Sequence, residues 1–154
     1  MIINAQDLIL GRLASFAAKQ ALLGEDVQII NCEKAVITGS RENVFAKLKA
    51  RQKPGDAYHA PTIYRMPDMF VRRVIRGMLP WKRTRGRLAY KKVFCYIGMP
   101  ESFKNKESIT IDNANINKLK NLRYVYIKEV SKYLGKEIKW ITLQKNNLNK
   151  LLTN

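Results

Sequence analysis

The sequence has 154 residues, with 29 lysines and arginines against 12 aspartates and glutamates, which gives a formal net charge of +17. This length and a hydrophobic fraction of 46% allow one ordinary domain to bury a core without disulfide bonds. Even if every acid pairs with a base, 17 positive charges have no partner within the chain. The composition therefore excludes a self-neutralised surface and favours a polyanionic partner.

Metal-ligand residues are few and poorly spaced. Cys32 and Cys95 lie in apolar runs and form no CxxC pair, and His59 is the single histidine. We therefore expect no metal and no cofactor, and we expect reduced, buried thiols, with a bridge between the two cysteines left open. No signal segment follows Met1 and no apolar run is long enough to span a membrane. We expect a soluble, cytoplasmic protein without membrane contacts.

The start of the chain predicts strands that alternate with a helix. A short apolar strand is expected at residues 1–5, followed by a helix that ends at Gly24 and has Asp7 placed to cap its start. Short β-branched runs predict further strands at residues 26–31 and 35–38. Because no hairpin turn signal separates these strands, and helix-length segments adjoin them, we expect parallel pairing.

The middle of the chain predicts further helices and one more strand. A second helix is expected from Ser40, and residues 52–65 read as an extended loop. Pro67 suits the first turn of a third helix. A short helix at residues 88–92 and a buried strand at 93–97 are expected to close the core.

The pattern is weaker beyond Pro100. Residues 101–121 are polar, 124–127 resemble a strand, and a short helix is expected to end at Gly135. Residues 138–152 could form an amphipathic helix that packs on the domain or on a neighbour, and packing on the domain is the preferred interpretation.

The most basic stretch is residues 72–87, RRVIRGMLPWKRTRGR, which contains no carboxylate. Its first three arginines share one face of a predicted helix whose other face is apolar. Gly77 and Pro80 are expected to end this helix, and an arginine-rich loop follows, in which Gly86 permits backbone conformations closed to other residues. Guanidinium groups bind phosphate oxygens in pairs, so the stretch predicts a nucleic-acid-binding surface. A solvated basic face is the alternative.

Candidate catalytic groups are scarce. His59 lies in a proline-flanked loop, where a lone histidine is more often a surface residue than a general base. The chain has no GxSxG, no HExxH and no phosphate-loop motif, and LGRLAS has one glycine where a dinucleotide-binding turn has three. Asp26 and Glu33 flank a predicted strand and are interpreted as solvated acids. We expect no catalytic residue and no small-molecule substrate.

Aromatic residues accompany the basic segments at Tyr58, Tyr64, Trp81 and Tyr90. Such rings can stack on bases of single-stranded or looped RNA. Trp81 could instead pack within the protein and fix the angle of the arginine-rich loop. We prefer this interpretation because aromatic rings usually serve burial first.

Five motifs occur in an order that resembles one known family. They are GRLAS at residues 11–15, VQIINCEKAVITG at 27–39, VIRGMLPWK at 74–82, TRGR at 84–87 and YIGMP at 96–100. Together they closely resemble large-ribosomal-subunit protein thirteen, in the form of its archaeal and eukaryotic branch. YVYIKEVSKYLG at 124–135 extends the similarity. Asn4 and Cys32 depart from the family, which commonly has aspartate and alanine there.

The resemblance implies an α/β fold of three layers, α/β/α, with a central and mainly parallel sheet of four strands. It also implies that the chain has no catalytic activity and binds large-subunit ribosomal RNA beside neighbouring large-subunit ribosomal proteins. By the same resemblance, Arg76 and Gly77 of RGMLP would contact RNA, as would Arg12. Lys82, Arg85 and Arg87 would do so too. With the basic stretch itself, the predicted RNA-binding residues are Arg12, Arg72, Arg73, Arg76, Gly77, Lys82, Arg83, Arg85, Arg87 and Lys91.

We therefore expect residues 1–154 to form a single ribosomal RNA-binding domain with a C-terminal extension from about residue 136. Its expected role is that of a structural constituent of the large ribosomal subunit, which binds and stabilises ribosomal RNA. Two alternatives stay open: an RNA-modifying enzyme on the same layered fold, and a translational regulator that binds messenger RNA.

Overall fold

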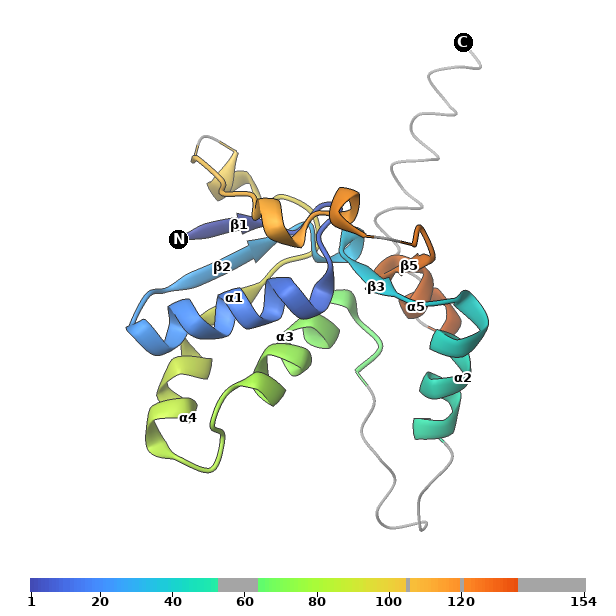
Figure 1. Cartoon of the computed structure of the whole chain (residues 1–154). Coiled ribbons are helices and arrows are strands. Elements are labelled where there is room, and N and C mark those ends of the chain that lie inside the picture. The colour runs from blue at the N-terminus through green and yellow to red at the C-terminus, as the bar shows by residue number, and fades with distance from the viewer. Residues whose placement is uncertain (53–63, 105, 120, 136–154) are drawn as a thin grey trace.

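Two separate sheets organise the part of the chain that the computed structural model describes, which is residues 1–52, 64–104, 106–119 and 121–135 (Figure 1). The strands are β1 (Ile2–Asn4), β2 (Val27–Ile30), β3 (Val36–Thr38), β4 (Val93–Cys95) and β5 (Tyr124–Tyr126). The helices are α1 (Leu10–Leu23), α2 (Arg41–Gln52), α3 (Pro67–Met78), α4 (Thr84–Lys91) and α5 (Ile127–Tyr133). Short 3₁₀ turns lie at η1 (Cys32–Lys34), η2 (Glu101–Phe103), η3 (Asp112–Ala114) and η4 (Ile116–Lys118).

The larger sheet is parallel and has the strand order β1-β2-β4. Ile3 of β1 lies opposite Ile29 of β2, and Ile29 lies opposite Cys95 of β4. Helix α1 connects β1 to β2, and the connection from β2 to β4 contains α2, α3 and α4. Parallel strands need long connections of this kind. Parallel pairing is therefore confirmed for the strands predicted at residues 1–5, 26–31 and 93–97.

The expected four-stranded sheet is wrong, because β3 does not join β1, β2 and β4. It pairs instead with β5 in a separate antiparallel sheet, where Ile37 lies opposite Val125. Only residues 31–35 link β2 to β3, and Asn31 takes a left-handed conformation with φ of 57° at the turn. Such a link is too short for a parallel crossover, which takes a dozen residues or more. The three-layer arrangement stays a prediction.

The main core lies between α1, α3 and the parallel sheet. The predicted apolar face of α1 is confirmed, since Leu13, Ala14 and Ala17 are fully buried. They share one cluster with Val27 and Ile29 of β2, with apolar side chains of β1 and β4, and with Val71 and Ile75 of α3. Burial of apolar area stabilises this arrangement by about 25 cal/mol per Å². Gly24 ends α1 in a left-handed conformation, as expected, with φ of 105°.

The expected capping role of Asp7 is wrong. Helix α1 starts at Leu10 with Ile9 at its N-cap, and no side chain caps it. Asp7 has a φ of 56°, and its Oδ1 accepts a hydrogen bond of 3.1 Å from the hydroxyl of Tyr126. Its carboxylate therefore ties β5 to the segment before α1.

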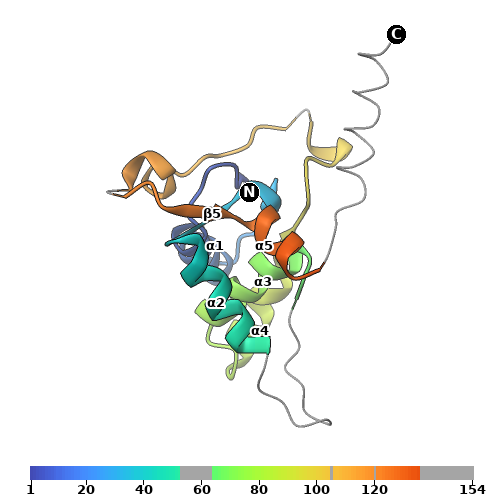
Figure 2. The ribbon, with the colours of Figure 1, turned by 90° about the vertical axis from the view of Figure 1, so that its right-hand side faces the viewer.

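A second, smaller core joins α2 to β5 and α5. Val44 and Leu48 of α2 pack with Val125, Val130 and Leu134. Figure 2 shows α2, β5 and α5 together on one side of the molecule. The predicted strand near residues 124–127 and the helix before Gly135 are both confirmed, and Gly135 has a φ of 81°.

The polar segment after Pro100 is fixed to the domain by its backbone. Ile109 forms a single parallel bridge with Ile3, and the amide of Ile9 donates to the carbonyl of Ala114 at 2.7 Å. The predicted helix at 138–152 and most of the loop predicted at 52–65 lie outside the described residues. Within the described ranges, none of the helices combines the length and apolar character needed to cross a bilayer.

Candidate nucleic-acid interface

Helix α3 has one buried face and one basic face. Pro67 occupies the first turn, as expected, and Val71 and Ile75 are fully buried against α1 and the sheet. Arg72 and Arg73 fall between these buried positions, and Arg76 follows Ile75. Packing of the apolar face leaves Arg73 exposed and the other two arginines half-buried. The predicted amphipathic helix and its approximate end are therefore confirmed.

Two arginines of α3 lie over aromatic rings from the following segment. The guanidinium carbon of Arg72 is 4.7 Å from the ring centroid of Tyr90, and that of Arg76 is 3.9 Å from the ring centroid of Trp81. The two rings meet edge to face, with centroids 5.1 Å apart and an interplanar angle of 89°. We call these four residues the arginine–ring stack. Each cation–π contact contributes about 0.5–1 kcal/mol at an exposed site and fixes the plane of the guanidinium.

The stack agrees with the preferred interpretation of Trp81, which packs against other side chains of the chain. Its contacts connect the end of α3 to α4. The sequence did not predict that arginines 72 and 76, one helical turn apart, would each lie over a ring. The spacing of the two arginines on one face was the only signal for it.

The segment expected to be an arginine-rich loop is largely helical, because α4 begins at Thr84 and not near residue 88. The amide of Arg83 donates to the carbonyl of Pro80 at 3.0 Å, and this turn leads directly into the helix. Gly86 lies within α4, where a Cβ atom would overlap the Pro80 carbonyl oxygen and stand 2.5 Å from its carbonyl carbon. Glycine is needed for this close approach, not for a positive φ.

Basic side chains of α4 and the residue after it hold the helix in place. Arg85 Nη2 donates to the Leu22 carbonyl at 3.4 Å, and Lys92 Nζ donates to the Gly24 carbonyl at 2.6 Å. Both carbonyls lie at the C-terminal end of α1, where cations interact favourably with the helix dipole. Arg87 Nε donates to the Trp81 carbonyl at 3.3 Å. These residues have an internal role in addition to the predicted external one.

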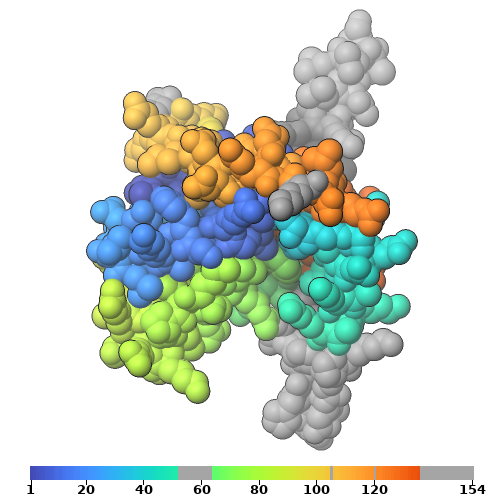
Figure 3. Space-filling view, viewed as in Figure 1, coloured from blue at the N-terminus to red at the C-terminus, as the bar shows by residue number. Residues whose placement is uncertain are grey.

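The result is a basic surface made by α3, α4 and the turn between them. Most of its cations are exposed, while the two arginines of the stack are half-buried. In Figure 3, α3 and α4 (yellow-green) form the projecting lower left part of the molecule. We call it the α3–α4 surface, and its cations are Arg72, Arg73, Arg76, Lys82, Arg83, Arg85, Arg87 and Lys91. Gly77 is exposed beside it, with open space where a Cβ would stand.

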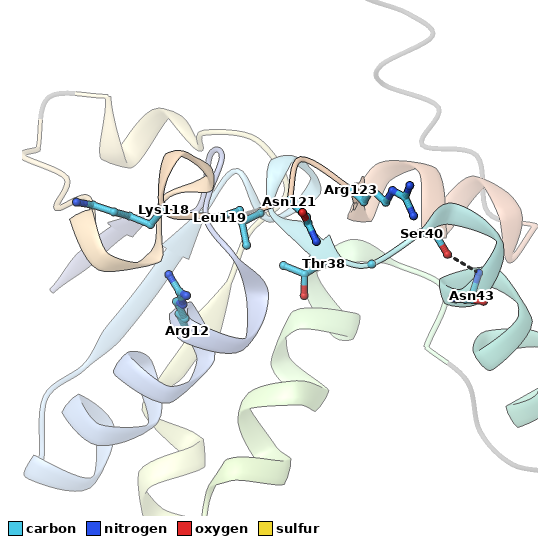
Figure 4. A pocket seen from close by; sticks show the side chains of 9 residues that line it. Arg12, Thr38, Ser40, Asn43, Lys118, Leu119, Asn121 and Arg123 are labelled. Atoms are coloured by element: carbon cyan, nitrogen blue, oxygen red, sulfur yellow. Dashed lines mark hydrogen bonds between the residues drawn. The ribbon is translucent and has the colours of Figure 1, made fainter.

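Arg12 does not belong to this surface. It lies in the first turn of α1, whereas α4 contacts the last turn, about 15 Å away at 1.5 Å per residue. Its Nη1 donates to the Asn113 carbonyl at 2.7 Å. Arg12 lines a groove of about 530 Å³ whose other walls include Thr38, Ser40, Lys118, Asn121 and Arg123 (Figure 4). We call this the Arg12 groove. Lys118 and Arg123 were not predicted as site residues.

The groups considered for catalysis have structural roles. Glu33 was expected to be a solvated acid, which is wrong: it is buried, and its Oε2 accepts a 2.9 Å hydrogen bond from the amide of Gly98.

A hydrogen bond with Cys95, followed by burial, raises the pKa of the Cys32 thiol well above its ordinary value, so the thiol is a weak nucleophile. Both thiols are free; Cys32 is buried, and Cys95 is only half-buried. His59 lies outside the described residues. In the remainder, no three metal-ligating side chains cluster together.

Comparison with known proteins identifies the family. The family model described as "Ribosomal protein L13" matches residues 1–102. The large ribosomal subunit protein uL13 of Methanosarcina barkeri is 43% identical over 135 residues, which cover 87% of this chain and 96% of that protein. The proteins of the same name from Archaeoglobus fulgidus and Natronomonas pharaonis are 42% identical over 135 residues (87% of this chain, 86% of that protein) and 38% identical over 140 residues (91% and 94%). This chain therefore belongs to the ribosomal protein L13 family, which the motif order in its sequence had indicated.

Proposed function

We propose that this chain is a structural constituent of the large ribosomal subunit in the cytoplasm, and that its α3–α4 surface binds and stabilises large-subunit ribosomal RNA. The relatives are named as large-ribosomal-subunit proteins. The family comprises structural ribosomal proteins and not enzymes, which removes the RNA-modifying alternative. The proposal treats residues 1–154 as one RNA-binding domain, with the segment from about 136 as an extension beside neighbouring ribosomal proteins.

The observation that carries the proposal is the arginine–ring stack. Arg72 and Arg76 lie over the rings of Tyr90 and Trp81. The rings fix the orientation of both guanidinium groups before any partner arrives, which lowers the entropy lost when they bind phosphate oxygens. Two buried polar atoms of α3, Arg72 Nε and Asp68 Oδ1, have no hydrogen-bond partner in the described structure.

The exposed cations around the stack supply the rest of the binding free energy. Lys82, Arg83 and Lys91 are exposed and lie on the turn and helix that follow Trp81. Each phosphate that such a side chain neutralises releases counterions, so binding weakens steeply as salt rises. A polyanion with many regularly spaced phosphates is the partner that this arrangement fits, and ribosomal RNA is such a partner.

A salt titration tests the proposal. In the variant Lys82→Gln, Arg83→Gln, Lys91→Gln, the slope of log affinity for large-subunit RNA against log salt is expected to fall by about 2–3 units, because three phosphate contacts are lost. A matched variant, Lys49→Gln, Lys128→Gln, Lys132→Gln, removes the same charge from exposed positions on α2 and α5. It is expected to keep a slope close to that of the unchanged protein. Equal slopes for both variants would contradict the proposal.

Cosedimentation separates this function from messenger-RNA regulation through the same surface. If the proposal holds, most of the protein travels with large subunits in a cell extract. The Lys82, Arg83, Lys91 variant moves towards the free fraction, while the matched variant does not. Protein that stays with messenger RNA and away from large subunits would favour the regulator.

A further inference from the structure

The Arg12 groove is a basic site that three separate parts of the chain build. Arg12 comes from the first turn of α1, Thr38 and Ser40 from the end of β3 and the start of α2, and Lys118 and Arg123 from the segment that leads to β5. The described residues that line it include three cations and no carboxylate. The groove has a volume of about 530 Å³, which is the size of a small ligand site.

The three cations lie along the groove and do not surround one point. In Figure 4, Lys118 is at one end and Arg123 at the other, with Arg12 below and between them. A single compact anion could contact only part of this row. An extended chain of phosphates could contact all three cations, because its charges repeat along its length.

The floor of the groove includes the backbone of Gly39. Gly39 has a φ of 130°, a conformation that other residues rarely adopt, and a Cβ there would meet the side chain of Val44 in α2. Its amide donates to the carbonyl of Arg123 at 2.9 Å, which fixes the two walls to each other. Thr38 and the amides of Asn43 and Asn121 add neutral hydrogen-bonding groups around the floor. Such groups bind phosphate and sugar oxygens without selecting a base sequence.

Arg12 is held in place by the 3₁₀ turn η3, which precedes the groove residue Lys118 in the chain. Its Nη1 donates to the Asn113 carbonyl in η3. A guanidinium has five N–H donors, so this bond leaves others for a ligand. The bond restricts the orientation of the Arg12 side chain, although the residue is exposed in the first turn of α1.

We propose that the Arg12 groove binds the sugar–phosphate backbone of a second RNA segment, apart from the RNA on the α3–α4 surface. The inference rests on the proposed function and extends it to a second site. Because the two sites lie at opposite ends of α1, the protein joins two RNA segments across one rigid helix. An acidic segment of a neighbouring protein is the competing occupant, and the row of cations with spaces between them favours the regular charges of RNA.

Footprinting of the RNA backbone on the complex of the full chain with large-subunit RNA tests this inference. The groove variant is Lys118→Gln, Arg123→Gln, which spares Arg12 and its hydrogen bond to Asn113. The matched control is Lys128→Gln, Lys132→Gln, which removes the same charge from α5. The surface variant Lys82→Gln, Arg83→Gln, Lys91→Gln marks the RNA that contacts α3 and α4.

The groove variant is expected to lose one protected RNA region that the surface variant keeps, and to lower the salt slope by about 1.4–1.8 units. The matched control is expected to keep both regions. If the groove variant protects the same RNA as the unchanged protein, the groove does not bind RNA and the inference is overturned, while the proposed function stands. If the unchanged protein protects no RNA, the proposed function itself fails. A groove variant that keeps all RNA protection but loses a crosslink to a neighbouring protein in assembled subunits identifies a protein occupant and also overturns the inference.

Discussion

The α3–α4 surface and the Arg12 groove are both basic, but they are built differently. The surface comes from one continuous stretch, residues 72–91, whose cations alternate with buried positions. The groove brings Arg12 together with Lys118 and Arg123, which lie more than a hundred residues later in the chain. Aromatic rings lie against three cations of the surface, Arg72, Arg73 and Arg76, whereas a backbone carbonyl holds one cation of the groove.

This difference shows two ways in which a chain can place charge for a polyanion. On the surface, local sequence decides which side chains face outward, and the rings reduce their freedom before binding. In the groove, the antiparallel pairing of β3 with β5 and the hydrogen bonds of residues 111–119 decide which cations meet. Substitutions in the α3–α4 surface should therefore leave the Arg12 groove unchanged, and substitutions in the groove should leave the surface unchanged.

The largest expected effect follows from Gly86→Ala. The new methyl group overlaps the backbone of Pro80, so α4 must move away from the turn that precedes it. Overpacking of this kind lowers the free energy of unfolding by about 1–3 kcal/mol or more, which urea denaturation measures. RNA protection on the α3–α4 surface should weaken, while protection at the groove should persist.

Gly77→Ala is the matched control, because open space surrounds the Cβ position there. Alanine in a helix is favoured over glycine by about 0.5–1 kcal/mol, so stability should stay the same or rise. If RNA approaches the backbone at Gly77, as expected from the family resemblance, this variant loses RNA affinity without loss of stability. An equal loss of stability in both variants would contradict the steric explanation for Gly86.

The second-largest effect on stability and RNA affinity is expected for Trp81→Ala. This substitution removes the ring under Arg76 and beside Tyr90. Loss of the edge-to-face pair and one cation–π contact lowers the free energy of unfolding by about 1–2.5 kcal/mol. RNA affinity should fall although no charge is lost. Trp81→Phe keeps a ring and should recover most of the affinity in the same titration. Unchanged affinity in Trp81→Ala would show that the stack does not order the surface for binding.

The fold could be predicted where a local sequence pattern determines the element. The apolar spacing of Leu13, Ala14 and Ala17 predicted α1, and the β-branched run at 27–30 predicted a central strand. Both patterns involve only residues that are close together in the sequence. The pairing of β3 was not predictable in this way, because its partner β5 lies almost ninety residues away. The short link after β2 carried the relevant signal, since it cannot contain a parallel crossover.

The same reasoning separates the predicted site residues from the missed ones. The basic stretch could be recognised because its residues are contiguous and one predicted helix arranges several of them. The helical start of α4 was missed because Gly86 suggested a loop, although its role is close packing on Pro80. Lys118 and Arg123 have no periodic pattern, and only the folded chain brings them to Arg12.

A smaller effect is expected when Arg76 is replaced by lysine. Arg76→Lys keeps the positive charge but removes the planar guanidinium that lies 3.9 Å from the centre of the Trp81 ring. RNA affinity should fall about two- to fivefold, as expected for a loss of about 0.5–1 kcal/mol of ordering contact. Arg83→Lys, at an exposed position outside the stack, should change affinity less in the same titration. Equal effects at both positions would mean that charge alone determines binding on this surface.

The smallest effect concerns the frame of the groove and depends on pH. Burial, followed by the hydrogen bond to Asp7, raises the pKa of Tyr126 from 10.0 to about 12. The neutral phenol is thus favoured in the folded state, so its contribution to stability is complete below pH 10 and is lost as pH rises towards about 12. Urea denaturation should show that the unchanged protein and Tyr126→Phe differ less in free energy of unfolding as pH rises across this range. Lysine titration affects both proteins alike, so it cancels in this comparison. The backbone carbonyl of Asp7 accepts a hydrogen bond from the amide of Ile116, near the groove residue Lys118. Tyr126→Phe should therefore weaken RNA protection at the groove more than at the α3–α4 surface.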